Sequence, residues 1–340
     1  MSVKRENKEV SMMRIEKLGE RKVIGIIQSH LDLMPKMPIP FGDDVAAYDI
    51  GNGDLAILKT DMLVSKTDVP PSMTLWQAAR KAVVMNVSDF AAKGVRPKVM
   101  LVSLGLPKVM EERDVEELAT GLNIGAREYD AYVIGGDTGE ASDLVISLSL
   151  FGTAAKGEVM LRNGARPGDF LAVTGFFGKT SAGLRILLHN VEVRERLRKV
   201  LVESVLLPRA RLKEGLALKE TGAVSAAIDS SDGLAWSLHE IAMASSVGLT
   251  VDELPLAYEA ERFAEDNNID PEKLALYGGE EYEIVLTVKP NLWSTAEKAV
   301  KRVGGTLLQI GTVTSKKNIV FKSNGKKCAV KQRGYEHFKT

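Results

Sequence analysis

Aspartate side chains recur where an apolar segment of this sequence meets a turn rich in glycine or serine. They are Asp43, Asp44, Asp61, Asp89, Asp137, Asp229 and Asp232. Each one alone is typical of a turn or a helix cap. Several carboxylates that converge repel one another unless a cation lies between them, and Mg²⁺ is usually held by a few carboxylates together with substrate phosphates. The set therefore indicates a divalent-metal site that handles phosphate.

Two pairs of polar residues have a spacing that places both side chains of the pair together. Asp229 and Asp232 are three residues apart across a turn from strand into helix, and Ser231 lies near a helix N-terminus that favours phosphate. Asn86 and Asp89 are three residues apart on one face of an apolar helix. Both pairs fit a polar pocket, although partly buried caps account for the second pair equally well.

Helix and strand signals alternate along the chain, which is typical of an α/β or α+β protein. We expect strands at 54–61, 99–106, 131–134, 144–150, 169–174, 223–229 and 283–288, and helices at 72–94, 114–129, 180–188 and from about 232. Ser72 is the expected N-cap of the first of these helices, and Gly94 its expected end. The local composition changes around 154–168, where Gly, Lys, Arg and Pro become frequent. We therefore expect two domains, 1–155 and 156–340.

Composition excludes several classes of protein. The chain has 340 residues, enough for about two domains. Its 45 Lys and Arg balance 45 Asp and Glu, which argues against a protein that coats nucleic acid or an anionic membrane. Cys328 is the only cysteine, the N-terminus has no signal-peptide pattern, and no apolar run is long enough to span a bilayer. We expect a cytoplasmic protein.

Other catalytic patterns are weak. The segment from Gly175 to Thr180 follows a strand and opens a helix, as a phosphate-binding P-loop does. That loop needs four residues between its glycines, whereas two separate Gly175 from Gly178, and Val173 stands where the first glycine belongs. A plain tight turn is the better interpretation. The four histidines, His30, His189, His239 and His337, match no metal-binding or triad pattern.

Taken together, these segments resemble the thiamine-monophosphate kinase family over nearly the whole chain. Nine segments match in order: Phe41-Gly-Asp-Asp-Val-Ala-Ala47, Lys59-Thr-Asp-Met-Leu63, Asn86-Val-Ser-Asp-Phe-Ala-Ala-Lys-Gly94 with Pro97, Gly135-Gly-Asp-Thr138, Arg162-Asn-Gly-Ala-Arg-Pro-Gly-Asp169, Val173-Thr-Gly175, Ala227-Ile-Asp-Ser-Ser-Asp-Gly-Leu234, Gly278-Gly-Glu-Glu-Tyr-Glu283 and Gly334-Tyr-Glu-His-Phe338. Each segment alone is a weak signal, but nine in register are strong.

The resemblance implies the two-domain fold of the aminoimidazole-ribonucleotide synthetase superfamily. In that fold the N-terminal domains of a homodimer pair into a β-barrel, the C-terminal domain is α/β, and the nucleotide sites lie near the dimer interface. The implied reaction is direct in-line transfer of a phosphoryl group from ATP to thiamine monophosphate, which gives ADP and thiamine diphosphate. The acceptor phosphate is already ionised near neutral pH, so the reaction needs positioning and charge neutralisation rather than a strong base.

The resemblance also assigns roles to particular residues. It implies that several Mg²⁺ ions are held by Asp44, Thr60, Asp61, Asp89, Asp137, Asp229 and Asp232, with Asp44, Asp89 and Asp229 central to catalysis. It also implies that ATP is contacted by Gly136, Asp137, Arg162 and Ser231. The thiamine end of the acceptor is implied to lie near Asp68, Glu280 and Tyr335.

Three departures from the family pattern concentrate near the acceptor. Asp68-Val69 replaces a His-Phe pair, Trp236-Ser237 stands where an aspartate is common, and Glu281 replaces an aspartate. Two alternatives therefore stay open. One is a different ATP-dependent enzyme of the superfamily, such as an aminoimidazole-ribonucleotide synthetase. The other is a non-catalytic regulator that binds nucleotide.

Overall fold

The computed structural model describes residues 14–189, 191–323 and 326–338. The chain divides into a small unit, Met1–Lys36 with Tyr335–Thr340, and a large unit, Met37–Gly334, which are described separately. In the small unit α1 (Ile15–Leu18) and α2 (Glu20–Gln28) precede a segment near the C-terminus. The backbone N–H of His337 donates to the Glu20 carboxylate at 3.3 Å, and the rings of Tyr335 and His337 meet edge to face.

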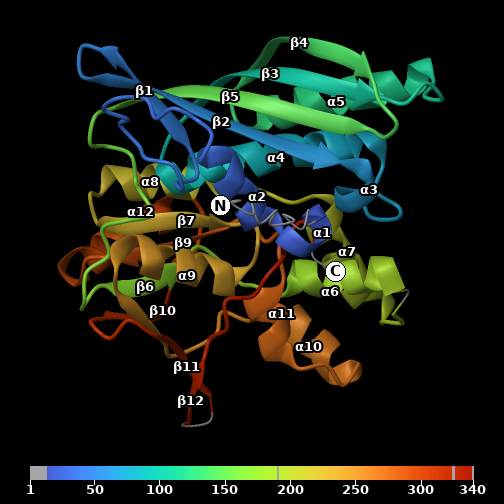
Figure 1. The fold of residues 1–340 in the computed structure, drawn as a ribbon. Helices are drawn as coiled ribbons and strands as arrows, with labels where there is room; N and C mark the ends of the chain where they lie inside the picture. The colour runs from blue at the N-terminus through green and yellow to red at the C-terminus, as the bar shows by residue number, and fades with distance from the viewer. Residues whose placement is uncertain (1–13, 190, 324–325, 339–340) are drawn as a thin grey trace, which may run out of the picture. The chain divides into compact units, whose positions relative to one another are not determined.

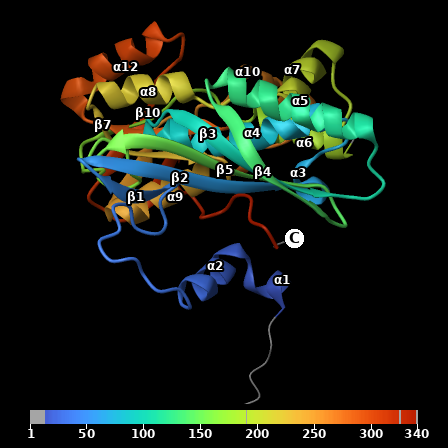
Figure 2. The same cartoon turned by 90° about the horizontal axis from the view of Figure 1, so that it is seen from above.

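Five strands of the large unit form its first sheet. They are β1 (Ala46–Gly51), β2 (Asp54–Val64), β3 (Pro97–Leu106), β4 (Tyr132–Glu140) and β5 (Val145–Ala155), in the spatial order β1-β2-β5-β3-β4. All neighbours are antiparallel except β3 and β4. The helices α4 (Leu75–Lys93) and α5 (Glu112–Glu128) lie on one face of this sheet (Figures 1 and 2). The sheet is open, with β1 and β4 as its edges.

Seven strands form the second sheet, in the order β12-β11-β8-β10-β6-β9-β7. They are β6 (Phe170–Val173), β7 (Val224–Ser230), β8 (Gly248–Val251), β9 (Glu283–Val288), β10 (Leu308–Thr314), β11 (Ile319–Ser323) and β12 (Lys326–Ala329). The helices of this half are α6 (Lys179–His189), α7 (Glu195–Leu206), α8 (Leu212–Glu220), α9 (Leu234–Ser245), α10 (Tyr258–Asp266), α11 (Pro271–Tyr277) and α12 (Trp293–Arg302). The two short helical turns of the large unit are α3 (Ser65–Asp68) and η1 (Pro290–Leu292).

Helix α4 is the central element, because it packs on strands of both sheets as well as on α5 and α8. Fifteen of its 19 residues are buried, so every face of the helix meets protein. Thr74 is its N-cap and forms a capping box with Gln77, while Gly94 ends it in the left-handed conformation at φ 64°. The expected N-cap, Ser72, was wrong by two residues: Ser72 has φ 74° and lies in the preceding turn.

One hydrophobic cluster joins the two sheets. It includes Ile57 and Leu148 from the first sheet, Phe90 from α4, and Ala227 and Leu286 from the second. The two halves of the large unit therefore share a core, and the domain boundary at 155/156 stays a prediction.

Most expected elements are present. The strands expected at 54–61, 99–106, 223–229 and 283–288 are β2, β3, β7 and β9, and the helix expected at 114–129 is α5. Strand β4 runs six residues beyond the expected 131–134 because its glycines pair with β3, and β5 runs five residues beyond 150. Among the described helices, each is too short or too polar to cross a bilayer. The cytoplasmic location stays a prediction.

Replacing Gly215 with alanine is expected to destabilise the fold. Gly215 lies in α8 against α4, and a Cβ there would stand 1.9 Å from the backbone oxygen of Ala91, which cannot move without shifting the central helix. We expect Gly215→Ala to lower the free energy of unfolding by about 2–3 kcal/mol in urea denaturation. Gly25→Ala is the control, because Gly25 is an exposed helical glycine with no neighbour within 4 Å. Equal stability of both variants with the wild type would contradict the close α4–α8 packing.

Candidate metal and phosphate site

Three buried carboxylates from three elements meet at one point. Asp44 precedes β1, Asp89 lies in the last turns of α4, and Asp229 is the last residue but one of β7. One oxygen atom of each lies within 4.8 Å of the others. The hydroxyl of Ser88 donates to Asp229 at 3.0 Å. The converging geometry predicted for these three aspartates is therefore present, and their roles in metal binding and catalysis stay predictions.

Basic side chains neutralise only one side of this cluster. The guanidinium of Arg162 donates to Asp44 through Nε at 2.6 Å, and Lys93 Nζ lies 2.8 Å from the same carboxylate. Lys59 Nζ lies 2.8 Å from Asp89. Asp229 has no ion pair among the described residues. The cluster is thus rich in cations at Asp44 and deficient at Asp229.

The pKa values follow this distribution. Burial raises the pKa of Asp89 well above its ordinary value, although Lys59 opposes the rise, and burial with the charge of Asp44 raises the pKa of Asp229 to about 6. Burial also disfavours ionised Asp44, but Lys93 and Arg162 outweigh it and hold the pKa of Asp44 below its ordinary value. Negative charge is therefore under-compensated between Asp89 and Asp229.

The donor set fits a hard divalent cation. All three groups are carboxylates, the class of ligand that Mg²⁺ prefers. Two further buried oxygens beside the cluster in sequence, Oδ1 of Asn86 and Oγ of Ser230, have no hydrogen-bond partner in the part of the chain that is described. A divalent ion would supply the positive charge that is missing beside Asp89 and Asp229. These carboxylates are ligands of the kind that such an ion prefers.

Two of the other expected metal ligands lie beside the cluster. Asp61 faces α4 from β2, with Oδ2 4.0 Å from Lys59. Asp232 is half-buried at the turn before α9, outside the group of three carboxylates.

Thr60 and Asp137 lie elsewhere. Because side chains alternate along a strand, Thr60 points to the outer face of the first sheet, and Asp137 is exposed on β4. Gly136 has a structural reason to be glycine, since a Cβ there would stand 1.8 Å from the backbone oxygen of Val102. The expected roles of these three residues stay predictions.

Arg162 contacts the cluster through Asp44, and Ser231 follows Asp229 by two residues. Arg162 also donates to the carbonyl oxygen of Gly42 at 2.8 Å and to Glu240 at 3.3 Å, so its guanidinium is fixed in orientation. Ser231 is exposed, and its carbonyl oxygen accepts from the backbone N–H of Glu280 at 2.6 Å. That bond places the expected acceptor residue Glu280 next to an expected nucleotide contact.

Lys81 contacts two of the expected acceptor residues, Asp68 and Glu280. Its buried Nζ donates to the backbone oxygen of Asp68 at 2.8 Å and to the Glu280 carboxylate at 2.5 Å. The Asp68 side chain is itself buried and accepts from the backbone N–H of Val64 at 2.7 Å. Glu280 has φ 64°, a strained conformation for a residue with a side chain. The third expected acceptor contact, Tyr335, belongs to the small unit.

In the P-loop-like turn from Gly175 to Thr180, the backbone donors are bound by a carboxylate of the protein itself. Glu281 accepts from the backbone N–H groups of Gly178 and Thr180 at 2.6 and 3.2 Å, and from the Thr180 hydroxyl at 3.1 Å. These are the donors at the start of α6 that a phosphate would need. The tight-turn interpretation is confirmed.

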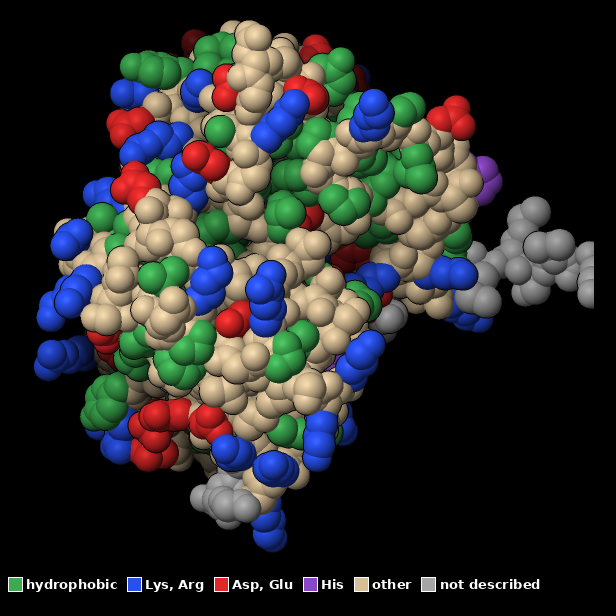
Figure 3. Space-filling view, turned by 90° about the vertical axis from the view of Figure 1, so that its left-hand side faces the viewer, with side chains coloured by type: hydrophobic (Ala, Val, Ile, Leu, Met, Phe, Trp, Pro, Cys, Tyr) green, Lys and Arg blue, Asp and Glu red, His purple; other side chains and the backbone are tan. Residues whose placement is uncertain are grey.

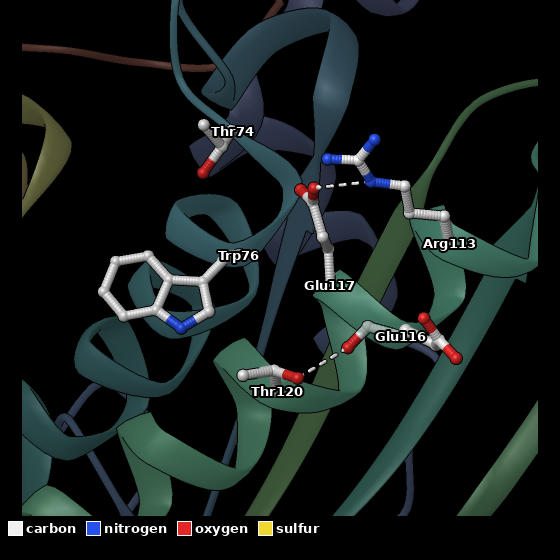
Figure 4. Close-up of a pocket in the computed structure, with 6 residues that line it drawn as sticks. All are labelled: Thr74, Trp76, Arg113, Glu116, Glu117 and Thr120. Carbon is white, nitrogen blue, oxygen red and sulfur yellow. Dashed lines mark hydrogen bonds and ion pairs between the residues drawn. The ribbon is translucent and has the colours of Figure 1, made fainter.

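Figure 4 shows a hollow at the start of α4 and along α5 that has a different character. It is lined by Thr74, Trp76, Arg113, Glu116, Glu117 and Thr120. Arg113 pairs with Glu117 one helical turn away, and the Thr120 hydroxyl donates to the backbone of Glu116. Because these polar groups pair with each other, the carboxylate cluster is the stronger candidate site.

Comparison with known proteins agrees with this geometry. The model of the AIR synthase related protein, N-terminal domain, matches residues 42–154, and that of the corresponding C-terminal domain matches 166–324. The thiamine-monophosphate kinase of Nitrosopumilus maritimus (strain SCM1) is 35% identical over 325 residues, covering 96% of this chain and 100% of the relative. The chain belongs to the thiamine-monophosphate kinase family.

Two further members of the family support this assignment. The thiamine-monophosphate kinase of Escherichia coli (strain K12) is 33% identical over 88% of this chain and 91% of its own. The solved structure of AaThiL complexed with AMPPCP and TMP superposes with a TM-score of 0.84 at 29% identity, covering 96% of this chain and 99% of that one. The expected two-domain fold of the aminoimidazole-ribonucleotide synthetase type is confirmed. Both sheets of the described residues are open, so no barrel forms among them, and the barrel across a homodimer stays a prediction.

Sequence analysis missed three lysines of the site, Lys59, Lys81 and Lys93. All three have nitrogen atoms bonded to carboxylates of the site, and Lys81 and Lys93 are fully buried. A signal existed for the last two, since both lie within a long helix that is otherwise largely apolar. Lysine is almost never fully buried unless it is paired, so its presence inside such a helix indicates a buried partner.

Replacing Glu281 with glutamine is expected to change the pH dependence of stability. Burial raises the pKa of Glu281 from 4.5 to about 7. The folded state therefore binds more protons than the unfolded state in this range, and this residue's contribution to stability is lost as the pH rises through about 7. Between about pH 5 and pH 8, urea denaturation should show that Glu281→Gln loses less stability than the wild type, by about 2–3 kcal/mol. Parallel pH profiles for the two proteins would refute the raised pKa.

Proposed function

We propose that the protein phosphorylates thiamine monophosphate with ATP, giving thiamine diphosphate and ADP. The observation that carries the proposal is the buried cluster of Asp44, Asp89 and Asp229, in a chain whose fold matches that of AaThiL complexed with AMPPCP and TMP. AMPPCP is an analogue of ATP that resists hydrolysis, and TMP is thiamine monophosphate here. A cluster that lacks positive charge is suited to a metal–phosphate complex.

The roles of this chain's residues follow from their charges and positions. Asp89 and Asp229, with Asp44, would hold Mg²⁺, which supplies charge neutralisation to the transferring phosphoryl group. Arg162 is fixed by Asp44 and Glu240 and would offer its guanidinium to nucleotide phosphate beside the cluster. Ser231, Gly136 and Asp137 complete the proposed nucleotide contacts. No residue has to remove a proton, because the acceptor phosphate is already ionised.

The acceptor end is proposed to lie at Glu280, with Asp68 and Tyr335 as further contacts. Thiamine carries a positive charge, so a carboxylate is a suitable neighbour. Lys81 holds one oxygen of Glu280, and the other oxygen, Oε2, is buried without a hydrogen-bond partner in the described residues. Glu280 is therefore positioned with one oxygen still available.

We also propose a homodimer that pairs the first sheets into a barrel. The outer face of this sheet carries exposed apolar side chains at Tyr48, Leu58, Met62 and Leu101. Hydrophobic side chains gather in the upper part of Figure 3, where this sheet lies. An exposed apolar face of this kind is typical of an interface, and the two open edges can pair with a partner. Thr60 shares this face and would lie at the proposed interface.

The activity is tested with thiamine monophosphate, Mg²⁺ and ATP labelled at the γ-phosphate. We expect label in thiamine diphosphate, and we expect Asp89→Asn to lower kcat about 100-fold or more through weaker transition-state stabilisation. Asp252→Asn is the control, because Asp252 is exposed and pairs with Lys322 away from the cluster. Absence of label from a folded protein that binds ATP would overturn the proposal in favour of another acceptor or a regulatory role.

The dimer is tested by light scattering of purified protein. The wild type should have twice the mass of the chain, and Leu101→Asp should have the mass of one chain, because it places a charge on each half of the apolar interface. Val109→Asp is the matched control, since Val109 is 88% exposed beyond the end of β3. A monomeric wild type, or a dimeric Leu101→Asp variant, would contradict this interface.

A further inference from the structure

Lys93, the last residue of α4, carries an ammonium group that is completely buried. Its Nζ lies 2.6 Å from Oδ1 of Asp43, 2.8 Å from Oδ2 of Asp44 and 2.8 Å from the carbonyl oxygen of Ala227. The contact with Ala227 is a hydrogen bond, and the contacts with the two carboxylates are ion pairs. Lys93 is therefore a dehydrated cation whose charge is directed at two carboxylates of the site.

The two carboxylates that face Lys93 also contact Arg162. Oδ2 of Asp43 accepts from the backbone N–H of Arg162 at 3.0 Å, and Oδ1 of Asp44 accepts from Nε of Arg162 at 2.6 Å. Two carboxylate oxygens and a carbonyl oxygen are also the ligands that a hard divalent cation takes. The ammonium of Lys93 thus occupies a position with the ligand set of a metal ion.

Asp89 and Asp229 differ from this pair. Among the described residues, Asp89 has one short ion pair, with Lys59, and Asp229 accepts only from the Ser88 hydroxyl. The demand for an added cation therefore lies at one end of the cluster only.

We propose that Lys93 is a permanent cation of the site, which takes the place of a divalent ion between Asp43 and Asp44 and leaves Asp89 and Asp229 to recruit metal. The recruitment of metal by Asp89 and Asp229 rests on the metal site of the proposed function. The consequence is that this chain binds one divalent ion fewer than it would with an uncharged side chain at this position. The metal-free protein also keeps Asp43 and Asp44 neutralised.

The test replaces Lys93 with methionine, a flexible apolar side chain of similar length. Bound Mn²⁺ is counted by titration, from the EPR signal of free Mn²⁺, and melting temperatures are measured in EDTA and with Mn²⁺. We expect Lys93→Met to bind one more Mn²⁺ than the wild type and to melt several degrees lower in EDTA, because two buried carboxylates have lost a counter-ion. Added Mn²⁺ should raise the melting temperature of the variant more than that of the wild type.

The double variant Asp43→Asn/Lys93→Met removes one charge of each sign. We expect it to return to the wild-type Mn²⁺ count and to depend less on metal for stability than Lys93→Met does. Lys98→Met, a change at an exposed lysine of β3, should leave both readouts unchanged. If Lys93→Met is obtained only with divalent metal present while the double variant folds without it, the proposal is supported.

An unchanged Mn²⁺ count, with an equal loss of melting temperature in EDTA and in Mn²⁺, would overturn the proposal. It would show that Lys93 contributes only to packing. Because these readouts need no turnover, they remain decisive even if thiamine monophosphate is not the acceptor.

Discussion

The burial of α4 between two sheets is the constraint on which the rest of the structure depends. A helix in this position has no solvent-facing side, yet α4 carries several charged residues in its buried length. A buried charge without a partner costs several kcal/mol, so each must find an opposite charge or a polar group on another element. Arg80 pairs with Glu128 of α5, Lys81 with Glu280, Asp89 with Lys59 of β2, and Lys93 with Asp43 and Asp44. These pairs tie both sheets and the loops of the site to one helix.

The same constraint shapes the electrostatics of the site. Because Lys93 and Arg162 come from within the fold, the charge of Asp44 is compensated before any ligand binds. Asp89 and Asp229 are buried with a single lysine between them and retain excess negative charge. The cluster is neutralised at Asp44 and short of positive charge at Asp89 and Asp229. A divalent ion therefore gains the most free energy by binding at Asp89 and Asp229.

The turn at the start of α6 shows how local chemistry can be redirected by the fold. Its glycines and backbone amides have the donor character of a phosphate loop, but Glu281 from the segment before β9 fills them. The neighbouring Glu280 is turned toward Lys81 by its left-handed backbone. One short segment thus closes a potential anion site with one carboxylate and offers the next to the acceptor side of the proposed active site.

The sequence by itself determined the alternation of strands and helices, the family, and the aspartates that could hold metal, because these depend on periodicity and on short motifs. It also rejected the P-loop from spacing alone. Only the tertiary structure decided which aspartates meet. Asp44, Asp89 and Asp229 converge, whereas Thr60 and Asp137 lie on exposed parts of the first sheet, since strand register sets which face each side chain takes. The pairing of the buried lysines was also decided only by the tertiary structure, because the partner of each is distant in sequence and becomes a neighbour through the packing of α4.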